Sequence, residues 1–136
     1  MITAVDSSVL LDVFKPDPSF VEQSLAALRR AITEGMLVAC DVVWAEIAGA
    51  FAAREAFEET MAQAHVVYSP MNASSAVRAG EAWRAYRARG GKRTRVVADF
   101  LIGAHARLQA DRLLVRHRGF YRTYFPDLAM VDPSGT

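Results

Sequence analysis

Short apolar runs alternate along the chain with longer segments in which apolar residues recur at helical spacing. The clearest helical segment covers 20–33, where Val21, Leu25, Leu28 and Ile32 share one face. We expect strands at 2–5, 36–40, 65–68, 112–115 and 129–131. We expect helices at 20–33, 42–57, 96–109 and from 72 to the glycines at 90 and 91, with shorter ones after Ser7 or Ser8, after 57 and at 120–125.

This alternation predicts an α/β fold, because strands separated by helices pair in parallel and are covered by helices on both faces. A length of 136 residues fits one domain spanning 1–136. In parallel sheets, ligands bind beyond the carboxyl ends of the strands. Asp6 follows the first expected strand and His117 lies just past the fourth. Both residues are therefore candidates for a site at this edge.

The composition is that of a soluble globular protein, with 52% hydrophobic and 23% charged residues. No uncharged apolar run reaches the ~18 residues of a membrane span. Asp6 falls where a signal peptide would be apolar. The single cysteine, Cys40, cannot form an intramolecular disulfide. We expect a cytoplasmic protein with no membrane association.

The net charge of +1 conceals an asymmetry between the two halves of the chain. Residues 1–68 carry four basic and ten acidic residues, a net charge of −6, whereas residues 69–136 carry twelve and five, a net charge of +7. The basic half could present one face that attracts nucleic acid. An ordinary solvated helix surface explains the same charges equally well.

Three carboxylates stand alone inside otherwise uncharged stretches. Asp6 is the only charge in 1–11, Glu46 the only one between Asp41 and Arg54, and Asp99 the only one between Arg95 and Arg107. Acidic residues are seldom buried unless their charge is compensated. Each has an alternative explanation alone: a turn cap for Asp6, a helix terminus for Asp99, a solvent-facing position for Glu46. Together they favour a shared divalent cation.

Oxygen-only ligands are typical of Mg²⁺ or Mn²⁺, and a carboxylate-bound cation can activate water for attack on a phosphodiester. The sequence contains no glycine-rich phosphate loop and no G-x-S-x-G elbow. A phosphoaspartate enzyme would need a second acid where Ser8 stands. Hydrolysis of a phosphodiester is therefore the chemistry that these residues favour.

The same segments resemble the PIN-domain ribonucleases, in particular the VapC-type toxins of type II toxin–antitoxin systems. AVDSSVLLDVF resembles their first motif, with Asp6 as a metal ligand and Ser8 as a supporting polar residue. VVWAEIAGAF resembles the second, with Glu46, and GKRTRVVADFLIGAHA the third, with Asp99. The resemblance implies a three-layer α/β/α sandwich with a mostly parallel sheet of about five short strands. It also implies Mg²⁺- or Mn²⁺-dependent endoribonuclease activity with Asp6, Glu46 and Asp99 as catalytic metal ligands, a homodimer and neutralisation by a VapB-type antitoxin.

The chain departs from this family at one position. Relatives usually carry a fourth acid where this chain has His117, in LLVRHRGFYRTYFPDLAMVDP. His117 would be either a substitute ligand, which predicts a preference for Mn²⁺ over Mg²⁺, or an exposed loop histidine. In the second case the chain could be a weakened PIN domain that binds RNA or a partner without cutting it. A small-molecule phosphohydrolase is a third alternative.

Basic residues flank the candidate acids on both sides. Four of them are candidates for holding RNA phosphates: Arg93, Arg95, Arg116 and Arg118. Ordinary solubilising roles explain each arginine about as well.

Overall fold

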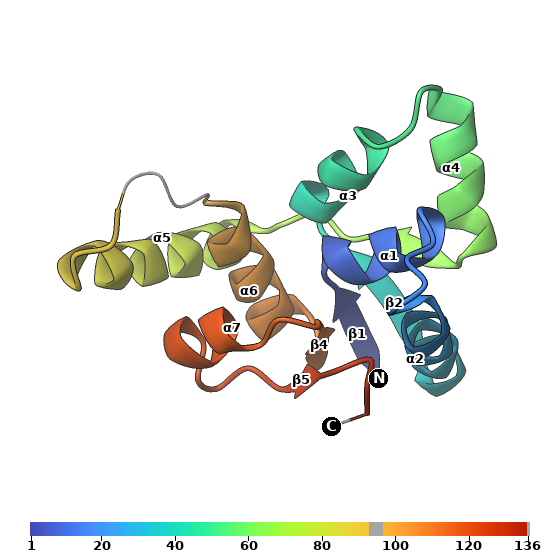
Figure 1. The fold of residues 1–136 in the computed structure, drawn as a ribbon. Coiled ribbons are helices and arrows are strands. Elements are labelled where there is room, and N and C mark those ends of the chain that lie inside the picture. Colours follow the sequence, from blue (N-terminus) through green and yellow to red (C-terminus); the bar gives the residue numbers. More distant parts are fainter. Residues whose placement is uncertain (93–96, 136) are drawn as a thin grey trace.

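The computed structural model describes residues 1–92 and 97–135, and its five strands form one sheet (Figure 1). The strands are β1 (Ile2–Val5), β2 (Met36–Ala39), β3 (Val66–Tyr68), β4 (Arg112–Leu114) and β5 (Met130–Val131). Their order in the sheet is β3-β2-β1-β4-β5, and each of the four pairings is parallel. The predicted α/β fold with a parallel sheet of about five short strands is confirmed.

The described part of the chain contains seven helices. They are α1 (Ser7–Phe14), α2 (Val21–Glu34), α3 (Asp41–Ala48), α4 (Arg54–Gln63), α5 (Ala73–Ala88), α6 (Ala98–Gln109) and α7 (Gly119–Tyr124). The single helix predicted at 42–57 is wrong, because α3 ends at Ala48 and α4 begins only at Arg54. In the break, Phe51 packs edge-on against Phe14 and Phe57. Burying this ring outweighs the continuation of the helix.

Two helices show how the pattern of apolar residues is used. The buried residues of α2 are Ser24, Ala27, Leu28 and Ala31, at i, i+3, i+4 and i+7. Of the predicted face only Leu28 is buried, because small residues let the helix pack closely while the larger side chains stay partly exposed. In contrast, α6 is buried almost all round from Phe100 to Ala106, as expected for a helix inside the domain. The first turn of α6 carries Asp99, so this acid is held by an element that the core fixes.

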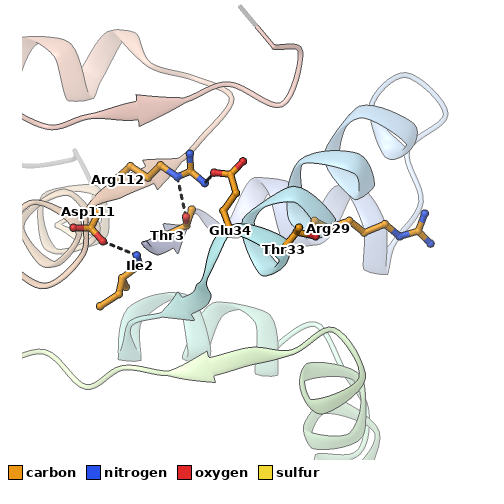
Figure 2. A network of polar contacts seen from close by, with 7 residues as sticks. All are labelled: Ile2, Thr3, Arg29, Thr33, Glu34, Asp111 and Arg112. Atoms are coloured by element: carbon orange, nitrogen blue, oxygen red, sulfur yellow. Dashed lines mark hydrogen bonds and ion pairs between the residues drawn. The ribbon is translucent and has the colours of Figure 1, made fainter.

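The amino ends of β1 and β4 are fixed by a polar network (Figure 2). Asp111 accepts a hydrogen bond from the backbone N–H of Ile2 at 2.6 Å. Arg112 donates to Thr3 Oγ1 at 2.9 Å and forms an ion pair with Glu34 of α2 at 2.7 Å. These contacts help to set the register of two central strands. Because the strands are short and parallel, the register also determines which residues meet at their carboxyl ends.

Candidate active site

Asp6 lies where β1 ends and α1 begins. Its backbone N–H donates to the carbonyl of Leu114 in β4 at 3.0 Å. Its Oδ2 atom accepts hydrogen bonds from the backbone N–H of Ser8 at 3.2 Å and from the Ser8 hydroxyl. Asp6 is therefore the N-cap of α1, the alternative explanation that its sequence position left open, and Ser8 contacts its carboxylate directly.

Asp6 shares a pocket of about 150 Å³ with Asp99 and His117. The pocket is lined by Asp6, Asp99, Val115, His117, Phe120 and Tyr121. Asp99 comes from the first turn of α6 and the remaining wall from the segment after β4. Sequence positions almost a hundred residues apart thus meet at the carboxyl edge of β1 and β4, as parallel pairing predicts.

Glu46 lies beside this pocket without lining it. It is an exposed residue of α3, and its Oε1 atom accepts a hydrogen bond from the Ser7 hydroxyl at 2.7 Å. Ser7 is buried and follows Asp6 directly in the chain. The contact therefore holds the third predicted acid next to the first. The role of Ser7 was missed by sequence reasoning, although its place beside Asp6 was a usable signal.

Among the residues that the structure describes, no three His, Cys, Asp or Glu side chains are close enough together to form a metal-binding group. The predicted triad is thus divided into two acids in the pocket and one tethered at its side. The donors fit the predicted cation in kind, because carboxylate oxygens are the preferred ligands of Mg²⁺ and also suit Mn²⁺. Asp6 and Asp99 would provide the central pair and Glu46 the outer acid.

Tyr121 links the three acids electrostatically. The residue is buried, with 3% of its surface exposed, and its hydroxyl donates to Asp6 Oδ1 at 3.4 Å. Burial raises the pKa of the phenol above its ordinary value, and the negative charges of Asp6 and Asp99 raise that pKa further, with a smaller effect from Glu46. The phenol therefore remains a protonated donor facing the acids. The sequence analysis did not single out Tyr121, and its place four residues after His117 was the only signal that could have pointed to the site.

The remaining predicted residues fall into two groups. His117 is exposed at the pocket, while the two arginines beside it form ion pairs: Arg116 with Asp12 at 3.1 Å and Arg118 with Asp132 at 3.4 Å. Arg93 and Arg95 lie outside the described residues. The structure thus brings Asp6, Asp99 and His117 together and gives Arg116 and Arg118 carboxylate partners within the protein.

Comparison with known families agrees with this arrangement. The family model of the PIN domain matches residues 3–126, from the second residue of β1 to just beyond α7. The chain belongs to the PIN domain family. This match covers Asp6, Glu46, Asp99 and His117 alike. No curated protein matches the PIN-domain chain in a sequence search.

Several solved structures share the fold of this PIN domain. VapBC2 from Rickettsia felis, bound to a promoter DNA fragment, aligns with a TM-score of 0.74 at 16% identity, over 97% of this chain and 98% of that one. VapBC-1 from nontypeable Haemophilus influenzae gives 0.73 at 20% identity, over 98% and 99%. FitAcB from Neisseria gonorrhoeae gives 0.71 at 19% identity over the full length of both chains. At these identities the similarity establishes the fold. No helix in the described part of the PIN domain is long and apolar enough to cross a membrane.

Proposed function

We propose that this PIN domain, spanning residues 1–136, is a metal-dependent endoribonuclease that hydrolyses RNA phosphodiester bonds as the toxin of a toxin–antitoxin pair. The observation that carries the proposal is the single pocket that Asp6 and Asp99 both line at the carboxyl edge of β1 and β4. The family match and the fold of the VapBC structures support it.

The chemistry follows from the oxygens at the pocket. Asp6, Asp99 and Glu46 would hold Mg²⁺ or Mn²⁺, which supplies an activated water and offsets negative charge on the phosphodiester. Ser8 and Tyr121 each donate to a different oxygen of Asp6 and so restrict its carboxylate. Ser7 does the same for Glu46. These contacts orient the acids, as supporting hydrogen bonds do at known metal sites.

The test is cleavage of cellular RNA by purified protein in EDTA, Mg²⁺ or Mn²⁺. Wild type should give discrete products only with metal, and Asp99→Asn should abolish them while leaving thermal unfolding intact. Glu81→Gln is the matched control, because Glu81 is an exposed acid on α5 that does not line the pocket. Retained cleavage by Asp99→Asn would refute the assignment of the acids.

A second function is favoured by His117 and by the division of the three acids. The chain would then be a weakened PIN domain that binds RNA or a protein partner without cutting. The same assay separates the two, with His117→Asp added. Cleavage by His117→Asp but not by wild type supports the binding function. Cleavage by wild type supports the nuclease.

We propose two protein partners. A VapB-type antitoxin would place a basic side chain toward the acidic pocket and compete with metal, so co-expression with its partner should yield an inactive complex.

A second copy of this chain would dock through β3, an edge strand whose Val67 and Tyr68 are 45% and 46% exposed. Light scattering of wild type and Val67→Lys tests this dimer, which the lysine should dissociate.

A further inference from the structure

Asp12 is a buried acid on α1, with 5% of its side chain exposed. Its Oδ2 atom accepts a hydrogen bond from the Ser24 hydroxyl of α2 at 2.7 Å. Its Oδ1 atom forms an ion pair with Arg116 at 3.1 Å. A buried carboxylate needs such partners because loss of water around its charge is otherwise costly. Asp12 lies at the opposite end of α1 from Asp6.

Arg116 is enclosed by the same contacts. Its guanidinium carbon lies 3.8 Å from the centre of the Phe20 ring, just before α2, and only 18% of its side chain is exposed. Its Nε atom is buried and has no hydrogen-bond partner in the described part of the chain. The side chain therefore points between α1 and the start of α2, away from solvent.

The neighbours of Arg116 form one wall of the acidic pocket. Val115 and His117 both line it, as does Tyr121 at the start of α7. On the other side of His117, Arg118 forms an ion pair with Asp132 beyond β5 at 3.4 Å. The segment that carries His117 is thus held at both ends, more firmly at Arg116, where the pair is closer and more buried.

We infer that Arg116 is a positioning residue: its pair with Asp12 fixes the wall formed by His117 and Tyr121 relative to α1, the helix that Asp6 caps. The inference rests on the proposed function and concerns turnover. It replaces the RNA contact that the sequence suggested for Arg116. A guanidinium that already neutralises a buried carboxylate and stacks on Phe20 could reach a phosphate only by leaving Asp12 unpaired.

A double-mutant cycle tests this role with Asp12→Asn, Arg116→Gln and the double variant. Each single variant should lower kcat about tenfold or more, as loss of supporting contacts does at metal sites, with KM unchanged. The double variant should be no slower than the singles. It leaves neither charge buried alone, so it should recover thermal stability but not kcat. Arg116→Lys, which keeps the charge but loses the planar fork, should rescue only part of kcat.

Three results would overturn the inference. Arg116 would be an RNA ligand if Arg116→Gln raises KM and if RNA binding by this variant depends less on salt, by the amount expected for about one lost phosphate contact. If the single variants keep the wild-type kcat per folded molecule, the ion pair only stabilises the fold. The same conclusion follows if the double variant recovers both thermal stability and kcat. Arg122→Gln is the control, because Arg122 is an exposed arginine of α7.

A second measurement keeps the inference testable if wild type does not cut RNA. The chain has three histidines, so the imidazole C–H signals can be assigned by NMR. Asp12→Asn and Arg116→Gln should each shift or broaden the His117 signal and leave that of His65, which precedes β3, unchanged. An unaltered His117 signal in both variants would overturn the inference. Absent RNA cleavage by wild type, in contrast, would count against the proposed nuclease.

Discussion

The hydroxyl of Ser7 donates a hydrogen bond to Glu46 at 2.7 Å and so joins residues 39 positions apart. Ser7 is the first residue of α1, and Glu46 belongs to α3. Because Asp6 directly precedes Ser7, this contact fixes the position of one predicted metal ligand relative to another. The serine is buried while the glutamate is exposed, so a side chain fixed by the core holds one that would otherwise lie free in solvent.

Ser7→Ala should weaken cleavage by raising the metal concentration needed for half-maximal rate about 10- to 100-fold. Without the hydroxyl, the exposed Glu46 side chain loses the donor that holds it near Asp6. Rates measured across a Mn²⁺ titration check this. Ser74→Ala, at an exposed serine of α5, is the control. An identical titration curve for Ser7→Ala would mean that Glu46 acts without this tether.

Tyr121→Phe should reduce cleavage about tenfold, because it removes the phenol that donates to Asp6 without changing the buried ring. It should also change stability at high pH. Burial and the nearby acids raise the pKa of the folded phenol above its unfolded value of about 10. The raised pKa therefore contributes fully to the free energy of unfolding below about pH 10, and this contribution is lost as the pH rises above that value.

Urea unfolding at pH 8 and at pH 10.5 measures this effect. Wild type should lose free energy of unfolding between the two conditions, and Tyr121→Phe should lose less. Tyr124→Phe, on the same helix, controls for removal of a tyrosine hydroxyl. Equal losses in wild type and Tyr121→Phe would show that the phenol ionises as readily in the folded chain as in the unfolded one.

Two glycine-to-alanine substitutions should have opposite effects on stability. A Cβ on Gly103 of α6 would lie 2.5 Å from Cε2 of the fully buried Phe125, so Gly103→Ala should cost about 1–3 kcal/mol. Gly80 lies inside α5, and no described atom beyond its chain neighbours and the backbone of its own helix lies within 4 Å of such a Cβ. Gly80→Ala should therefore stabilise the protein by up to about 1 kcal/mol. Thermal unfolding of both variants checks this prediction. A Gly103→Ala variant as stable as wild type would contradict the close contact between Gly103 and Phe125.

Manganese should support faster cleavage than magnesium if His117 helps to bind the cation, since imidazole suits Mn²⁺ better. His117 lines the pocket with Asp6 and Asp99. His117→Ala should then reduce the Mn²⁺-to-Mg²⁺ rate ratio toward one, whereas His65→Ala should leave it unchanged. Equal wild-type rates in the two metals would mean that His117 lines the pocket without binding the cation.

The sequence by itself determined the α/β class, the parallel sheet and the position of Asp6 at a strand end. These depend on local periodicity and on the general rule that strands separated by helices pair in parallel. The same local reasoning failed between α3 and α4, where the ring of Phe51 packs against Phe14 from another part of the chain. Periodicity carries no information about such a distant partner.

Only the tertiary structure decided how the acids are held. Ser7 meets Glu46, Tyr121 meets Asp6 from 115 positions away, and Arg116 pairs with Asp12 instead of remaining at the surface. Each contact depends on the direction of side chains from elements that only the assembled sheet brings together. Hydrophobic pattern specifies which faces are buried. The polar partners at the edge of those faces follow from register and packing, which long-range contacts set once the chain has folded.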